Sequence, residues 1–325
     1  MPSLLNMPDV AMNLILKKLD FQSILNLRKS CHALRDFIND VKPEAELQEI
    51  HVNAKMNFVR FRLFCTFRTT KIITYHNARE ACLVEWTTSE SVKQKSLPDS
   101  NYIDRACKDL QTLLELKTSG VLRHLNITLN YYSTQFLDSF VGALEAKREL
   151  LNVFDVYMDG FNLNQVVAFL PFLNSKKLEL ITIHARGEAS DSGFSKVSVL
   201  EQWKCAKEIS FLTIQEDTNL EHFVHCEKVF VSVNELSVKM ILALKEKLLS
   251  SPSMIYFTIS LNQFNSKTKL IEMLGEPCND DYSVWWYFGI PNCSAEVLCV
   301  VLVKDREVVF KRMQKDRVVE NAYIY

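Results

Sequence analysis

The stretch MPDVAMNLILKKLDFQSILNLRKSCHALRDFI, residues 7–38, contains three short helical patterns in succession. The first begins at Pro8, because a proline at the start of a helix lacks only an N–H that would have no partner there. Asp9 in the first turn and two lysines in the last turn complement the helix dipole. We therefore expect a first helix over about residues 8 to 19.

Apolar residues of this stretch recur at helical spacing. Those of the first helix form one stripe: Met12, Ile15, Leu16 and Leu19. Asp20 is placed to cap a second helix and Ser30 to cap a third. A unit this small rarely buries enough apolar surface to be stable alone. Its remaining apolar surface must therefore meet the rest of the chain or another protein.

Certain residues of the stretch add a family resemblance. They are Met7-Pro8-Asp9, the Leu19-Asp20 junction, Leu27-Arg28-Lys29, Cys31 and Leu34-Arg35-x-Phe37-Ile38. Together they resemble an F-box, in the form that nematode proteins combine with an FTH domain. In that family the F-box docks on a Skp-family linker protein, which connects it to the cullin-RING core of an SCF-type ubiquitin ligase.

The resemblance implies a set of residues that touch or support the linker: Met7, Pro8, Met12, Ile15, Leu16, Leu19, Ile24, Leu27 and Cys31. Ser30 departs from the family's usual Val-Cys pair, which leaves open whether linker binding is weakened. An alternative is that these helices only cap the domain that follows, in a protein-interaction repeat scaffold with no link to ubiquitin.

The composition indicates a globular chain without a polyanionic partner. Of 325 residues, 48% are hydrophobic and 24% are charged, which is typical of folded domains. The net charge of −1 removes any bulk electrostatic argument for nucleic acid or an anionic membrane. The apolar segment from residue 284 to residue 303 contains Pro291, Asn292 and Glu296, so two buried strands explain it better than a membrane span.

Cysteine usage and the N-terminal residues indicate where the chain acts. The nine cysteines include no Cys-x-x-Cys pair, so we expect reduced thiols. The first residues lack a positive segment followed by an uninterrupted apolar run, so no secretion is expected. We expect a cytoplasmic or nuclear location, or both.

Short β-rich runs follow the helices, which end before Lys42-Pro43. The runs are Leu47–Val52, Phe58–Phe64, Lys71–Tyr75 and Ala81–Trp86. In the second run Phe61 and Leu63 alternate with arginines, which predicts a half-buried strand in an antiparallel meander. Residues 87–100 are polar and end in turn-forming residues, so we expect a linker there.

Beyond residue 100 helical stripes alternate with strands, most of them about 27 to 30 residues apart. The predicted strands are Leu122–Leu129, Leu151–Tyr157, Leu178–Ile183, Glu208–Ile214, Lys228–Val233 and Met254–Ile259. This pattern predicts an irregular solenoid of the leucine-rich-repeat kind, whose exposed strand face is a gently concave surface for a protein partner. The span from about 100 to 260 is similar to the FTH domain of the nematode family.

The last part of the chain departs from this alternation. Strand patterns at Ser283–Phe288, Glu296–Val303 and Arg306–Met313 predict a β-rich cap, with a hairpin around a charged turn. The expected fold is thus mixed α/β. Its expected divisions are an F-box at 1–42, a β-rich connecting segment at 43–90, an FTH-like repeat domain at 100–262 and a C-terminal cap at 263–325.

No convergent set of catalytic groups emerges from the sequence. Seven glycines include no phosphate-binding pattern. His222 and His225 are spaced to share a helix face and bind a metal, as a hydrolase would require, but a second pair of ligands is missing, so a plain histidine pair is favoured. We therefore expect no catalytic residue, no metal and no cofactor.

Aromatic residues supply candidate interface anchors: Tyr131, Tyr132, Trp203, Trp285 and Trp286. Such residues are enriched at interface hot spots, although more of them belong to cores. The sequence thus predicts a non-catalytic adaptor. Its F-box would bind the Skp-family linker, and its repeat domain would bind an unknown target protein for ubiquitin-dependent degradation.

Overall fold

The chain divides into two compact units, residues 1–160 with 168–178, and residues 161–167 with 179–325. The computed structural model describes residues 7–19, 21–41, 43, 47–65, 70–79, 81–88, 91–115, 120–130, 133–146, 150–189, 191–214, 219–320 and 322–325.

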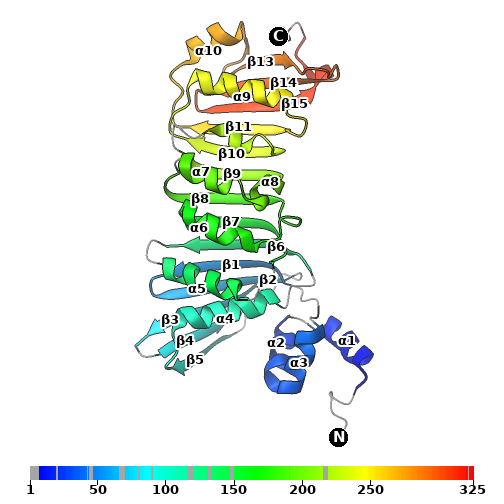
Figure 1. Cartoon of the computed structure of the whole chain (residues 1–325), viewed down its shortest axis with the longest axis vertical. Coiled ribbons are helices and arrows are strands. Elements are labelled where there is room, and N and C mark those ends of the chain that lie inside the picture. Colours follow the sequence, from blue (N-terminus) through cyan, green and yellow to red (C-terminus); the bar gives the residue numbers. More distant parts are fainter. Residues whose placement is uncertain are drawn as a thin grey trace. The chain divides into compact units, whose positions relative to one another are not determined.

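The first unit begins with three helices of equal length (Figure 1), α1 (Asp9–Lys18), α2 (Phe21–Ser30) and α3 (His32–Val41). The prediction of three helices is confirmed. Pro8 is the N-cap of α1, and its carbonyl accepts hydrogen bonds from the N–H groups of Ala11 and Met12.

The structure tests only one of the two predicted helix caps. Asp20 lies outside the described residues. The cap role of Ser30 is wrong, because Ser30 is the last residue of α2 and its Oγ donates to the Leu27 carbonyl at 2.7 Å. Its hydroxyl is thus bonded to the helix that ends there.

A sheet follows in the same unit, with the strand order β7-β6-β1-β2-β3-β4-β5. The strands are β1 (Leu47–Lys55), β2 (Phe58–Cys65), β3 (Thr70–Ala78), β4 (Ala81–Thr87), β5 (Val92–Pro98), β6 (Leu122–Leu129) and β7 (Val153–Phe161). β1 to β4 form the predicted antiparallel meander, β5 adds a fifth strand to it, and β6 pairs parallel to both β1 and β7.

The prediction of a linker over residues 87–100 is wrong for β5. This strand pairs antiparallel with β4 from Thr87↔Val92 to Ala81↔Pro98. All but one of its side chains are exposed, so it carries no apolar alternation to indicate a strand. Backbone hydrogen bonds along one edge of the sheet are enough to order it.

One face of this sheet is covered by helices, and the opposite face, in the part of the chain that the structure describes, is not. Phe61 and Leu63 of β2 are 0% and 1% exposed, and Tyr75 of β3 donates to Asp109 Oδ2 at 2.8 Å. Asp109 belongs to α4 (Tyr102–Glu115), which with α5 (Thr134–Glu145) lies over this face (Figure 1). We call it the covered face and the opposite one, which includes the exposed Arg62, the open face.

The second unit contains a sheet in the order β12-β13-β14-β15-β11-β10-β9-β8. Its parallel strands are β8 (Leu180–Ala189), β9 (Glu208–Ile214), β10 (Lys228–Val233) and β11 (Tyr256–Leu261). Between them the chain forms α7 (Asp191–Val197), α8 (Glu201–Cys205), η3 (Leu220–Phe223) and α9 (Val238–Ser250). Before β8 come α6 (Leu163–Phe169), most of which belongs to this unit, and η2 (Leu170–Phe172), which belongs to the first unit. The predicted alternation of helices and strands is confirmed, and β6, β9 and β10 have the predicted bounds.

Aromatic rings fill the core beneath these parallel strands. Trp203, Phe194 and Phe223 are all fully buried, with ring centroids 5.4 to 6.2 Å apart. The indole Nε1 of Trp203 donates to the His222 carbonyl at 2.9 Å. Trp203 is therefore a core residue.

The C-terminal part is β-rich, as predicted. After α10 (Lys267–Leu274) come β12 (Cys278–Asn279), β13 (Ser283–Gly289), β14 (Glu296–Val303), β15 (Glu307–Gln314) and η4 (Lys315–Arg317). The hairpin with the charged turn is confirmed, since Lys304 and Asp305 have φ of 50° and 53°, as a primed turn requires. β15 pairs antiparallel with β11 and thus covers the edge of the last parallel strand.

The other aromatic residues that the sequence suggests as interface anchors differ in burial. Trp286 is buried and Trp285 is half-buried, whereas Tyr131 and Tyr132 lie outside the described residues. In the part of the chain that the structure describes, no helix combines the length and the apolarity needed to span a bilayer.

Candidate partner-binding surfaces

Helix α1 carries apolar side chains on two opposite faces. Met12 and Leu16, four residues apart, are 3% and 1% exposed. Val10 and Leu14, also four residues apart, are 72% and 57% exposed, and Met7 just before the helix is 43% exposed. With 100° of rotation per residue, the second set points away from the first. We call Met7, Val10 and Leu14 the exposed stripe of α1.

The residues that the sequence assigns to linker docking fall into three classes. Met12, Leu16 and Ile24 are buried. Ile15, Leu19, Leu27 and Cys31 are partly exposed, and Met7 and Pro8 are exposed. The buried residues can support a docking surface but have little area left to offer a partner, whereas the others can make direct contact.

Val10 and Leu14 were missed by the sequence-based assignment. Their spacing from Met7, at i+3 and i+7, is itself a helical stripe. The apolar spacing was ambiguous because most positions of the helix are apolar. Two apolar stripes can therefore be drawn on it, and only the burial of the side chains shows which one faces the rest of the chain. Exposed apolar residues gathered on one helix face, unlike scattered ones, mark a site for a partner.

The open face of the first unit is a second candidate surface. Its strands present side chains that are polar, charged or aromatic and mostly half-buried: Glu49, His51 and Asn53 from β1, Phe58, Arg60, Arg62 and Phe64 from β2, His124, Asn126 and Thr128 from β6, and Asp155, Tyr157 and Asp159 from β7. Such a mixture of hydrogen-bonding groups and rings suits a protein partner.

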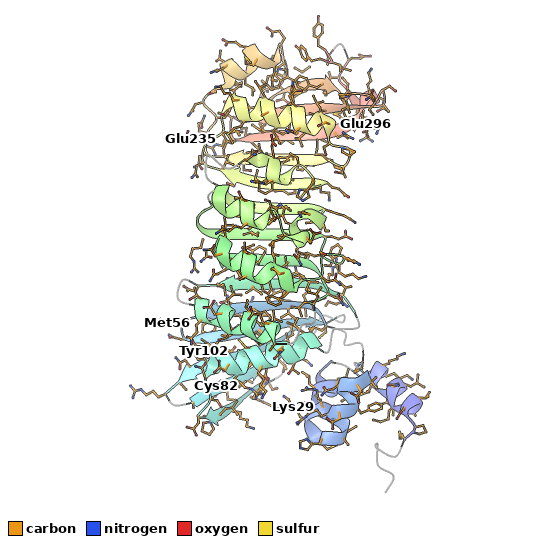
Figure 2. The ribbon with its side chains drawn as sticks, viewed as in Figure 1. Lys29, Met56, Cys82, Tyr102, Glu235 and Glu296 are labelled. Atoms are coloured by element: carbon orange, nitrogen blue, oxygen red, sulfur yellow. The ribbon has the colours of Figure 1, made fainter. Side chains whose placement is uncertain are left out.

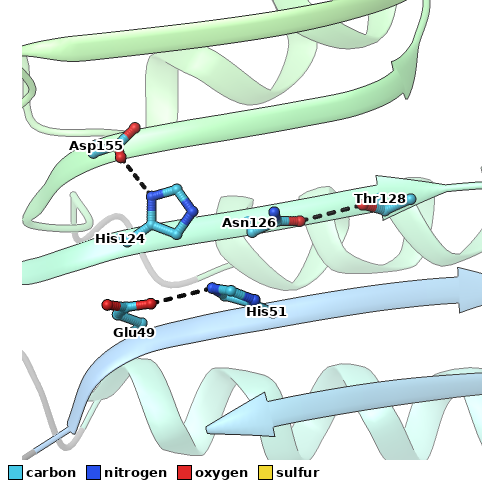
Figure 3. Close-up of polar contacts among 6 residues, drawn as sticks. All are labelled: Glu49, His51, His124, Asn126, Thr128 and Asp155. Atoms are coloured by element: carbon cyan, nitrogen blue, oxygen red, sulfur yellow. Dashed lines mark hydrogen bonds and ion pairs between the residues drawn. The ribbon is translucent and has the colours of Figure 1, made fainter. Parts of the chain in front are cut away.

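Two histidines lie at the centre of this face (Figure 3). The Nδ1 of His124 is 2.5 Å from Oδ2 of Asp155, and Nε2 of His51 is 3.3 Å from Oε2 of Glu49. The two imidazole centroids are 5.3 Å apart, in an edge-to-face arrangement. Asn126 next along β6 accepts from the hydroxyl of Thr128 at 3.2 Å.

The environments of the two histidines shift their pKa values in opposite directions. The hydrogen bond to Asp155 raises the pKa of His124 above its ordinary value, against the effect of burial. Burial lowers the pKa of His51, and the charge of His124 lowers it further, although Glu49 opposes both. At mildly acidic pH the proton therefore goes first to His124, which pairs with Asp155.

Neighbouring residues of β2 and β3 fix the side chains around this pair. The guanidinium of Arg60 donates through Nε to Thr74 Oγ1 at 3.2 Å and lies 4.9 Å from the ring centre of Phe58. The ring of Phe64 is 4.6 Å from that of His51. Rings and charges held in place in this way lose little conformational freedom on binding.

One imidazole of the histidine pair that suggested a hydrolase is hydrogen-bonded to the backbone. His225 Nε2 lies 2.8 Å from the Trp203 carbonyl, and burial lowers the pKa of His225. Among the described residues, no three acidic, histidine or cysteine side chains converge as metal ligands. The cysteines are thiols rather than disulfides, and burial raises the pKa of Cys107, Cys226 and Cys299 to about 12.

Comparison with known families identifies the two parts of the chain. Residues 4–45 match the F-box domain, and residues 134–274 match the FTH domain. The chain therefore carries one region that matches the F-box domain and a second that matches the FTH domain.

The similarity extends to a nematode relative. The chain is similar to F-box A protein 224 of Caenorhabditis elegans, with 24% identity over 263 residues. The aligned region is 79% of this chain and 66% of the relative, just under two thirds of that protein's length. No solved structure matches the chain.

Proposed function

We propose that this chain is a non-catalytic substrate adaptor of an SCF-type ubiquitin ligase. The F-box helices bind a Skp-family linker, which attaches the chain to a cullin-RING core. The FTH domain holds a target protein, so that its lysines stay close to the ubiquitin-conjugating enzyme. The contribution of the chain is proximity, which raises the local concentration of the target. Such an adaptor acts in the cytoplasm or nucleus.

The exposed stripe of α1 carries this proposal. Met7, Val10 and Leu14 offer apolar surface within the region that matches the F-box domain. Full burial of a side chain of this kind contributes about 1.5 to 3 kcal/mol before the costs of association. Three such residues, with the partly exposed Ile15 and Leu19 nearby, are enough for a stable complex.

The open face is the proposed site for the target; its strand β7 lies in the region that matches the FTH domain, and β6, β1 and β2 precede that region. Its strands β1, β6 and β7 are parallel neighbours, so their outward side chains form rows that resemble the exposed face of a leucine-rich-repeat solenoid. Support comes from the half-exposed rings and charges of β1, β2 and β6, which are held by their neighbours. This arrangement fits an extended protein segment better than a small ligand.

Pull-down of purified Skp-family linker by the full chain tests the linker half of the proposal. Replacing Val10 and Leu14 together, as Val10→Asp with Leu14→Asp, places two charges on the exposed stripe and should abolish capture. A matched control, Lys17→Gln with Lys18→Gln, lowers the net charge by the same amount in the exposed last turn of α1. Equal capture by both variants and wild type would reject the stripe as the docking site. Failure of the wild-type chain to capture linker would favour the alternative of a helical cap.

A further inference from the structure

A cavity of about 350 Å³ lies in the first unit, between helices α2 and α3 on one side and β3, β4 and α4 on the other. Lys29 of α2, labelled in Figure 2, is one of its lining residues. The volume is at the lower end of the range for small-molecule sites, about 300 to 1,000 Å³. None of the residues assigned above to linker docking or to the open face lines it.

The lining of this cavity is strongly basic. Five of its lining residues are cationic, and only Asp109 is acidic. The cationic residues are Arg28, Lys29, Arg35, Arg105 and Lys108. The whole chain has a net charge of −1, so this concentration does not follow from its composition. The charges come from both sides, three from α2 and α3 and two from α4.

The single carboxylate is already engaged. Tyr75 donates to Oδ2 of Asp109 at 2.8 Å, and Arg105 pairs with Oδ1 at 2.9 Å. Burial raises the pKa of Tyr75 well above its ordinary value, so its hydroxyl remains a donor. Asp109 thus neutralises Arg105 and leaves the other four cations without an acidic partner among the described residues.

The two arginines from the F-box helices are held side by side. Arg28 Nε donates to Asn39 Oδ1 at 2.9 Å, and Arg35 Nε donates to the Arg28 carbonyl at 3.3 Å. These bonds use Nε and leave the terminal nitrogens of both groups available. Burial and the charge of Arg35 lower the pKa of Arg28, and the charge of Asp109 only partly opposes them. Two cations in this arrangement repel each other, and a bound anion would remove the repulsion.

We propose that this cavity binds a small molecule that carries two or more phosphate groups. Arginine guanidinium groups form paired hydrogen bonds with phosphate oxygens, and lysines add point charges. Cations on both sides of the cavity need an anion with at least two charged groups to neutralise them. Trp86 and Ile73 supply an apolar wall for the remainder of the ligand. Such a ligand would bridge α4 with the F-box helices.

Isothermal titration of the full chain with inorganic tripolyphosphate tests this proposal, with orthophosphate as the single-phosphate comparison. We expect saturable binding of one tripolyphosphate per chain, at least about tenfold tighter than orthophosphate. The affinity should fall as NaCl is raised from about 50 mM, because salt screens the charges. Thermal unfolding should shift upward in the presence of tripolyphosphate, since a ligand of the folded state stabilises it.

Substitutions separate the cavity from general surface charge. Lys29→Gln with Lys108→Gln removes two exposed cations that make no hydrogen bond within the described residues, so folding should be unaffected, and tripolyphosphate binding should weaken at least about tenfold. Lys17→Gln with Lys18→Gln removes the same charge from α1, outside the cavity, and should leave binding unchanged. Absence of saturable binding at roughly 1 mM tripolyphosphate, or equal effects of the two double variants, would overturn the proposal.

Discussion

Leu14 and Leu16 are only two positions apart on α1, but replacing each by alanine should affect different properties. Leu14→Ala should weaken linker binding, and Leu16→Ala should lower the stability of the fold. Leu14 is 57% exposed and Leu16 is 1% exposed. Leu14→Ala removes surface that only a partner can cover, so we expect about 1 to 1.5 kcal/mol less binding energy, or about tenfold weaker linker affinity. Its effect on the free energy of unfolding should stay within about 0.5 kcal/mol.

Leu16→Ala should instead lower the stability of the helices themselves. Truncation of a fully buried leucine costs about 2 to 5 kcal/mol, because the lost contacts leave a cavity. Linker affinity measured below the unfolding transition should change less than for Leu14→Ala.

Two measurements on each variant separate these effects: titration with the linker, and urea unfolding followed by circular dichroism. The reasoning would be refuted if Leu14→Ala destabilised the chain as much as Leu16→Ala, since α1 would then bury both faces. Unchanged linker affinity in Leu14→Ala would equally exclude the exposed stripe from docking.

Three further predictions concern stability. Because folding raises the pKa of His124, the stability it contributes is present below its unfolded pKa of about 6.5 and is lost as pH rises through the higher folded pKa. Folding lowers the pKa of His51, so the stability that His51 contributes is lost as pH falls below its unfolded pKa of about 6.5. The free energy of unfolding, measured with urea across pH, should thus have a maximum near pH 6.5. This maximum should disappear in the double variant His51→Gln, His124→Gln. Trp203→Phe removes the hydrogen bond to the His222 carbonyl and part of a buried ring, so thermal unfolding should show a loss of about 2 kcal/mol, and a change under about 0.5 kcal/mol would argue against this core. Gly275→Ala should destabilise the chain by at least about 1 kcal/mol in the same assay, because φ is +91° and the new Cβ would lie 2.6 Å from the Tyr325 hydroxyl, whereas Gly142→Ala, with open space around it, should not.

Much of the fold was predictable because apolar residues alternate with polar ones in half-buried strands such as β9 and β10, and form a nearly continuous apolar run in the more deeply buried β14. β9, β10 and β14 have the bounds that their sequences predict, and Pro8 marks the start of α1. β5 was not predictable from its side chains, since Lys93, Gln94 and Lys95 give no apolar period and pairing with β4 orders the strand. Ser30 shows the same limit, because its hydroxyl could bond to either neighbouring helix.

The surfaces were harder to predict than the elements. The sequence identified the F-box stretch but not which stripe of α1 stays exposed, because Leu14 and Leu16 are equally apolar. The contact between His51 and His124 joins strands more than seventy positions apart, and their pKa shifts follow from that contact. The basic cavity is likewise lined by residues from separate segments, so no local sequence motif predicts it.

The central claim is that the chain serves as an adaptor, and its most direct test is assembly. The full chain would be mixed with purified Skp-family linker and a cullin-RING core, and the mass of the eluted species would be measured by light scattering after gel filtration. The account predicts one species that contains all three components in equal amounts, which the Val10→Asp, Leu14→Asp variant fails to form. Elution of the wild-type chain apart from a linker–cullin complex would contradict the account.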